Sequence, residues 1–117
     1  MQVEVNNQQI INYCGIRCAM EVLGGKWKLL IIASLFKEAM RFKDLKRAIP
    51  EISDKMLDSS LKELELHGLI CRELYQENSH RGVYTLTTYG VAIRPLLETL
   101  YAWGEDHIKQ YPELMLQ

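Results

Sequence analysis

The sequence has no long hydrophobic run: its longest apolar stretch, residues 29–36 with one serine, is far short of the roughly 20 residues needed to cross a bilayer. The N-terminus also lacks the basic start and apolar core of a secretory signal. No Gly/Ser-rich or Pro-rich linker and no internal repeat divides the 117 residues, a length that suits one domain with its own core. We therefore expect a single cytoplasmic domain that has no membrane partner.

Cysteine and histidine are scarce, with three residues of each. An odd number of cysteines does not suggest an extracellular disulfide framework. Cys14 and Cys18 are four residues apart, but no second close Cys or His pair completes the spacing of a zinc site. A glycine-rich phosphate loop, a carboxylate pair and a histidine next to a nucleophile are also missing. We therefore expect no metal, no cofactor and no catalytic centre, so the protein should not be an enzyme.

The chain has little net charge, −1, but that value averages over an uneven distribution. Residues 26–47 contain seven basic residues and two acids, a local net charge of +5. The rest of the chain contains seven basic residues and thirteen acids, a net charge of −6. Such a chain can present one basic face to a polyanion, although a chance scatter of surface charges is the alternative.

Apolar residues at helical spacing predict four helices, over residues 15–23, 26–37, 42–48 and 54–67. The second is apolar nearly all round, so we expect it to be the buried central helix. Pro50 ends the third helix because the residue before a proline is pushed away from helical geometry. The fourth begins after Ser53, whose hydroxyl suits an N-cap, and stops at Gly68, which can enter the left-handed conformation.

After the fourth helix the hydrophobic pattern changes to period two. Residues 69–75 and 82–87 are rich in β-branched and aromatic residues, which predicts two strands of a hairpin. The polar residues between them predict a solvated tip. After Thr87 the pattern is helical again to about Gln110, and Pro95 is expected to kink this helix or to mark a helix start.

This order of elements is that of a winged helix-turn-helix. We predict a mainly α fold with a small β-hairpin (α+β) and an extra C-terminal dimerisation helix. The polar face of the fourth helix has no covering element, which is typical of a helix that reads the DNA major groove. The expected organisation is an N-terminal arm (residues 1–13), the winged domain with terminal dimerisation helices (14–112) and a tail (113–117).

Three segments resemble successive blocks of HxlR-type bacterial transcription regulators, in the same order and at similar separations: CGIRCAMEVLGGKWKLLII, RFKDLKRAIPEISDKMLDSSLKELELHGLI and VYTLTTYGVAIRPLLETLYAWG. The match runs from about residue 14 to residue 104. The family is similar in outline to the MarR and PadR regulators. The resemblance implies a homodimeric, DNA-binding repressor or activator.

The resemblance places the recognition helix at residues 53–67. Asp58 and the two serines that follow it depart from the family pattern, which more usually has Thr, Gln and a basic or amide residue there. A carboxylate would repel phosphate, although it can accept from the cytosine amino group. Serines are short and would read bases weakly or through water. These departures leave the bound DNA sequence open.

Ten residues are predicted to contact DNA. Lys55, Ser59 and Lys62 share one face of the recognition helix, although an ordinary solvated face is the alternative. The basic residues before the recognition helix suit phosphates because they flank it: Arg41, Lys43, Lys46 and Arg47. Lys26 lies by a helix N-terminus that favours a phosphate. The hairpin tip would reach the minor groove or the backbone, unless the wing makes no contact. The full set is Lys26, Arg41, Lys43, Lys46, Ser53, Lys55, Ser59, Lys62, His80 and Arg81.

The helix after Thr87 carries more apolar surface than one small domain can cover. We expect this surface to form a dimer interface with the first helix and the N-terminal arm, so that the operator is an inverted repeat in double-stranded DNA. Completion of the monomer's own core is the alternative. The predicted interface residues are Ile16, Met20, Leu96, Leu97, Leu100, Tyr101 and Trp103.

Cys14 precedes the first predicted helix, where N-terminal amide groups favour the reactive thiolate. The resemblance adds that several members of the family sense oxidants or electrophiles with a cysteine at this position. An inert, half-buried thiol is the alternative. Cys18 and Cys71 fall on apolar stripes and are expected in the core.

Two other functions also fit a winged helix. One is a non-specific nucleic-acid-binding protein, and the other is a protein–protein adaptor whose exposed helix face docks a partner. The excess of basic residues on the reading face favours DNA, whereas an acidic or apolar face would have favoured the adaptor.

Overall fold

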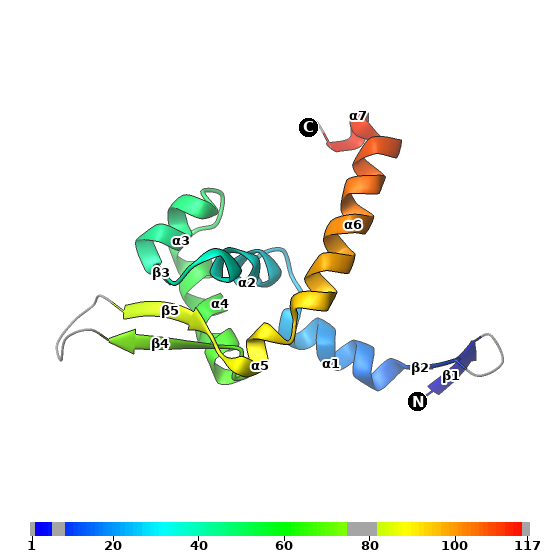
Figure 1. Cartoon of the computed structure of the whole chain (residues 1–117), viewed down its shortest axis with the longest axis horizontal. Helices are drawn as coiled ribbons and strands as arrows, with labels where there is room; N and C mark the ends of the chain where they lie inside the picture. Colours follow the sequence, from blue (N-terminus) through cyan, green and yellow to red (C-terminus); the bar gives the residue numbers. More distant parts are fainter. Residues whose placement is uncertain (1, 6–8, 75–81, 116–117) are drawn as a thin grey trace.

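A computed structural model of the chain describes residues 2–5, 9–74 and 82–115, with the side chains of residues 13–74 and 82–114. It confirms a mainly helical chain with a small antiparallel sheet (Figure 1). The elements, in chain order, are β1 (Gln2–Val5), β2 (Gln9–Asn12), α1 (Tyr13–Leu23), α2 (Lys28–Lys37), β3 (Met40–Arg41), α3 (Phe42–Ala48), α4 (Asp54–Leu66), β4 (Ile70–Leu74), β5 (Gly82–Leu86), α5 (Thr88–Val91), α6 (Arg94–Gln110) and α7 (Pro112–Met115).

The hydrophobic core gathers around α2, as the sequence predicts. Ile31 and Ile32 of α2 are fully buried, and they belong to one cluster with buried leucines of α3 and α4 and with residues of the sheet. Burying each such side chain contributes roughly 1.5–3 kcal/mol. Trp27 packs against the same cluster just before α2 begins. This shared core places the buried face of α4 against α2 and α3.

The turn between α3 and α4 is held by side chains at its two ends. The Lys46 ammonium group donates to the carbonyls of Pro50 and Ile52 and so ties α3 to the turn. Ser53 is the N-cap of α4, as predicted, because its hydroxyl accepts from the Met56 amide at 3.0 Å. At the C-terminal end of α4, Gly68 has a φ of +77°, a conformation that favours glycine.

The described residues form two antiparallel sheets: β1 pairs with β2, and three strands of the winged domain lie in the order β3-β5-β4. The predicted hairpin is present as β4 and β5, with Tyr84 paired to Arg72 on one side and to Met40 of β3 on the other. β3 was not predicted, because two residues are too short to show a period-two pattern. The predicted hairpin tip, residues 75–81, lies outside the described residues.

A short corner joins the wing to the C-terminal helix. The Thr87 hydroxyl accepts from the Gly90 amide (2.9 Å) and donates to the Gly68 carbonyl (2.6 Å). Gly90 packs so closely on Leu69 that a Cβ atom would lie 2.0 Å from the Leu69 carbonyl oxygen. The single predicted helix is thus two, α5 and α6, and Pro95 stands in the first turn of α6, one of the two roles expected for it.

Helices α1 and α6 project from the winged domain in different directions (Figure 1). Only Leu23 of α1 is buried, and no residue of α6 is. The prediction that Cys18 lies in the core is wrong, because its helix is attached to the domain only near its C-terminal end and leaves Cys18 exposed. α1 also begins at Tyr13, so Cys14 lies in its first turn rather than before it.

Candidate nucleic-acid interface

Helix α4, the predicted recognition helix, has a buried face and an exposed face. Leu57, Leu61 and Leu64 pack in the core, each no more than 1% exposed, at the spacing of one helical stripe. Ser60 is buried with them, so it does not lie on the reading face where the sequence placed it. The exposed face contains the predicted DNA contacts Lys55, Ser59 and Lys62, together with Met56, Asp58 and Glu63.

Charge on this face is partly neutralised within α4 itself. Lys62 Nζ is 2.9 Å from Asp58 Oδ2, and this hydrogen bond and charge raise the pKa of the lysine. Lys55 makes no ion pair with any residue that the structure describes, and its side chain is exposed. Ser59 donates to the Met56 carbonyl at 3.2 Å. Of the two predicted contact lysines on α4, Lys62 is therefore paired within the helix, and Lys55 is exposed without an ion pair to any described residue.

The basic residues of α3 and of its N-cap, Arg41, fall into two groups. Arg41 and Lys43 are exposed at the start of the helix, where the Arg41 amide donates to the Asp44 carboxylate at 3.0 Å. Arg47 pairs with the other oxygen of Asp44 at 3.5 Å. Lys46 is half-buried and committed to the turn carbonyls, so its role in the structure is to hold the helix-turn-helix.

The base of the wing contains a basic residue that the sequence prediction missed. Arg72 of β4 lines a small cavity of about 200 Å³ with Phe42, Asp58, Gly82 and Tyr84. The Arg72 side chain occupies the space where a Cβ atom on Gly82 would stand. Burial raises the pKa of Tyr84, which lines the same cavity. The available signal was Gly82, which lies in the predicted hairpin two residues before Tyr84, the residue that pairs with Arg72. The predicted wing contacts His80 and Arg81 lie outside the described residues.

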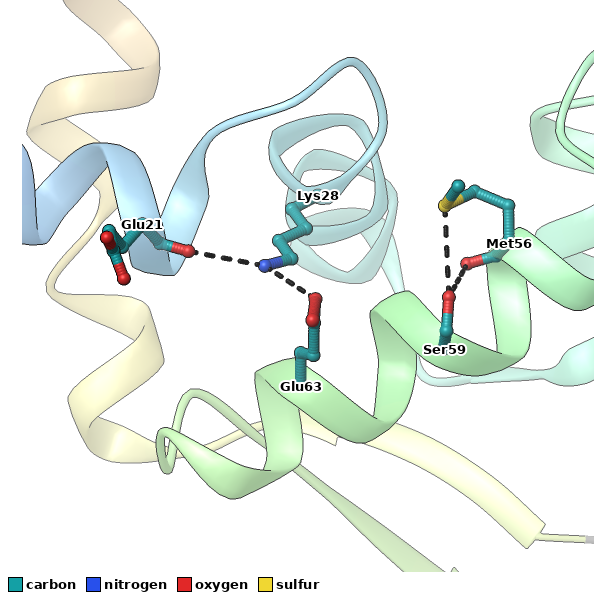
Figure 2. Close-up of polar contacts among 5 residues, drawn as sticks. All are labelled: Glu21, Lys28, Met56, Ser59 and Glu63. Atoms are coloured by element: carbon teal, nitrogen blue, oxygen red, sulfur yellow. Dashed lines mark hydrogen bonds and ion pairs between the residues drawn. The ribbon is translucent and has the colours of Figure 1, made fainter.

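Glu63, near the C-terminal end of α4, pairs with a lysine from another helix (Figure 2). Lys28 Nζ of α2 is 2.8 Å from Glu63 Oε2, and the same ammonium donates to the Glu21 carbonyl of α1 at 3.4 Å. The lysine lowers the pKa of the Glu63 carboxyl, first through the hydrogen bond and then through its charge. Sequence reasoning missed Lys28, because the contact depends on how three helices meet.

An apolar surface lies away from α4, on α1 and α6. A groove of about 640 Å³ separates α2 from α6 and is lined by Leu29, Leu30, Leu97 and Tyr101 among others. Lys26 also lines this groove, with its ammonium 4.9 Å from the Trp27 ring centre. Of the predicted interface residues, Leu97 is half-buried and the rest are 41–70% exposed: Ile16, Met20, Leu96, Leu100, Tyr101 and Trp103.

The cysteines differ in their surroundings. Cys14 is exposed in the first turn of α1, one helical turn before Cys18. Cys71 is half-buried on β4, with its sulfur 3.2 Å from the Thr85 hydroxyl. Within the described ranges, no three His, Cys, Asp or Glu side chains are grouped to hold a metal ion. No helix in the same part of the chain is long and apolar enough to span a membrane.

The family model described as HxlR-like helix-turn-helix matches residues 22–112. An HTH-type transcriptional regulator of Methanothermobacter thermautotrophicus is 41% identical over 92 residues, 79% of this chain and 70% of that protein. The crystal structure of the Bacillus subtilis HTH-type regulator YtcD superposes with a TM-score of 0.77 at 39% identity, over 80% of this chain and 96% of that one. A structure described as the redox regulator HypR in its oxidized form has a TM-score of 0.74 at 32% identity, over 80% and 96%.

Proposed function

This chain belongs to the HxlR-like helix-turn-helix family and is a transcriptional regulator rather than an enzyme, and on that premise we propose that it acts as a homodimer on an inverted-repeat operator. A regulator of this kind acts on the chromosome, so the proposal also places it in the cytoplasm. The observation that carries it is the exposed polar face of α4. That face bears Lys55 and Ser59 and is held by a core that buries every leucine on the opposite stripe.

DNA fits this face better than a protein partner does. Lys55 and Lys62 are exposed on α4, Lys43 is exposed on the neighbouring helix α3, and Arg41 is exposed at the N-cap of α3. Positive charge on both helices of the unit suits phosphates on either side of a major groove. An adaptor would more often present an apolar patch here. The large apolar patch of this chain lies instead on α1 and α6.

The dimer proposal rests on that second surface. Exposed aromatic and aliphatic side chains on α1 and α6, beside an apolar groove, are typical of a homodimer interface before association. A two-fold axis there would present two copies of α4, and two half-sites about one turn of DNA apart would match them. Leu97, Leu100 and Tyr101 are the residues that we assign to the centre of this contact.

The direct test uses the DNA upstream of the protein's own gene and of its divergent neighbour in an electrophoretic mobility shift. We expect a retarded complex that weakens steeply as salt rises, because phosphate contacts release counterions. Analytical sedimentation of the free protein at micromolar concentration should give a dimer. Affinity that does not change with salt, or a monomer in sedimentation, would contradict the proposal.

We further propose that modification of Cys14 controls DNA binding. Its relative HypR is described as a redox regulator, and here Cys14 is exposed at the end of the helix assigned to the dimer. An oxidant such as diamide accepts two electrons and two protons as two thiols form a disulfide. These thiols are Cys14 of each subunit, or Cys14 with Cys18. The bond would tilt one subunit against the other, and a few kcal/mol of bias is enough to release the operator.

The cysteine proposal is tested with wild type, Cys14→Ser and Cys18→Ser, each treated with diamide and then titrated with operator DNA. We expect wild type to lose affinity and Cys14→Ser to keep it. Cys18→Ser shows whether Cys18 is the second thiol. If Cys14→Ser responds as wild type does, Cys14 is not the switch.

A further inference from the structure

Lys28 stands where three helices meet. It extends from α2 between α1 and α4, and its ammonium group reaches both the Glu21 carbonyl (3.4 Å) and the Glu63 carboxylate (2.8 Å), as Figure 2 shows. The Lys28 side chain is only 12% exposed, whereas that of Glu63 is 56% exposed, so the lysine is held among the helices while the carboxylate stays partly open to water. The other two ion pairs of the described chain each stay within one helix, α3 or α4. The Lys28 contact is therefore the one that connects separate helices.

α1 has few other attachments to the winged domain. Leu23 is its only buried residue, and Val22 packs beside the core. Directly after α1 the chain turns through Gly24 and Gly25, and Gly25 has a φ of +88°. Because α1 is attached at one end and continues into a glycine turn, the contacts of its last turn set its angle to the domain. The Glu21 carbonyl, held by Lys28, is one of these contacts.

Glu63 lies on the same side of α4 as Lys55 and Ser59, two exposed residues predicted to contact DNA. Lys55, Ser59 and Glu63 are spaced by four residues, so they follow one another along one side of the helix. Lys55 is at the N-terminal end of that stripe and Glu63 is at the C-terminal end. A displacement of Glu63 therefore also displaces the side of α4 that carries Lys55.

We propose that Lys28 is a positioning residue that couples the angle of α1 to the orientation of the recognition helix α4. When α1 moves, the Glu21 carbonyl moves with it, and the shared ammonium must leave either that carbonyl or Glu63. The DNA-reading face is then held less firmly or in another orientation. The inference rests on the proposed function for its effect on DNA, whereas the coupling between the two helices does not depend on DNA.

Glu63→Gln is the decisive variant because two explanations predict opposite signs. If Glu63 acts only as a negative charge on the DNA-binding surface, its removal should strengthen binding. If it is the anchor that Lys28 uses to position α4, its removal should weaken specific binding. Glu65→Gln is the matched control, since it removes the same charge from the same helix two residues further on.

The experiment measures affinity by fluorescence anisotropy for the upstream duplex and for a scrambled duplex of the same length. We expect Lys28→Met and Glu63→Gln each to weaken specific binding by about 10-fold, and the double variant to be no weaker than either single variant. Lys28→Arg should restore most of the affinity. Glu65→Gln should bind as tightly as wild type or more tightly. Equal or tighter binding by Glu63→Gln overturns the proposal.

A second measurement does not need DNA. Amide hydrogen exchange in residues 20–27 and 59–66 should be faster in Lys28→Met and Glu63→Gln than in wild type, and unchanged in Glu65→Gln. If wild type binds no duplex but exchange changes in this pattern, the proposed function fails and the coupling stands. If exchange in residues 20–27 is the same in Glu63→Gln as in wild type, α1 and α4 are not coupled through Lys28.

Discussion

α4 and α6 are both amphipathic, but they cover their apolar residues in different ways. α4 lays Leu57, Leu61 and Leu64 into the core of its own chain, and each is 1% exposed or less. α6 buries no residue, and Leu100 and Trp103 are 45% and 66% exposed. An apolar stripe must be covered by some other surface. The difference separates a helix whose apolar stripe is covered by its own chain from a helix whose apolar stripe this chain leaves exposed.

The largest expected effect comes from a substitution in the buried leucine stripe of α4. Leu57→Ala should lower the free energy of unfolding by about 2–5 kcal/mol, because it deletes buried methyl groups and leaves a cavity. Leu66→Ala, on the same helix at 81% exposure, should change it by less than about 0.5 kcal/mol. Thermal and denaturant unfolding of both variants provide the comparison. Equal losses would show that α4 is not packed as described.

The exposed apolar stripe of α6 is tested by placing a charge at its centre. Leu100→Glu should give monomers in sedimentation and weaken operator binding about 100-fold, because the two half-sites are no longer bound together. The fold of the subunit should survive, since Leu100 is half exposed, whereas the same change at Leu97 would also disturb packing on the core. Leu114→Glu, 58% exposed in α7, is the control and should remain dimeric.

A smaller effect is expected on the exposed face of α4. Lys55→Ala should weaken the specific complex by about 1–3 kcal/mol if Lys55 reads a base edge, and leave non-specific binding nearly unchanged. Lys43→Ala on α3 should weaken both kinds of binding alike and reduce the salt slope. Lys46→Ala is a poorer choice for this test, because Lys46 also holds the turn. If both variants lose specific and non-specific binding to the same extent, Lys55 contacts a phosphate rather than a base.

The smallest effect concerns pH. Lys28 lowers the pKa of Glu63 below its ordinary value of 4.5, so the folded protein binds that proton less readily than the unfolded chain does. The stabilising contribution is present above the ordinary carboxyl pKa and is lost as pH falls through the lowered value. Melting temperatures measured down from pH 5 should therefore fall less steeply for Glu63→Gln than for wild type. Parallel curves would contradict this.

Sequence reasoning predicted α4 well, because its signals are local: a serine cap, leucines at spacings of four and three, and a glycine stop. It predicted the exposure of Leu100 and Trp103 for the same reason. Cys18 was misplaced because a periodic stripe shows which face is apolar and not which element covers it. Lys28 was missed because a lysine in a run of apolar residues gives no sign of a carboxylate 35 positions away. β3 was missed because two residues are too short to show a pattern, whereas Pro95 did signal that a helix starts at α6.

The corner at Thr87 has a consequence for engineering the chain. Its hydroxyl connects the Gly68 carbonyl with the Gly90 amide, and Gly90 lies against the Leu69 backbone. An inserted residue at positions 87–90 would separate these groups, break both hydrogen bonds and disturb the close packing of Gly90 on Leu69. Fusion partners, affinity tags and circularly permuted ends are therefore best kept away from this corner. A single glycine inserted after Thr87 should reduce soluble expression far more than one inserted after Tyr111.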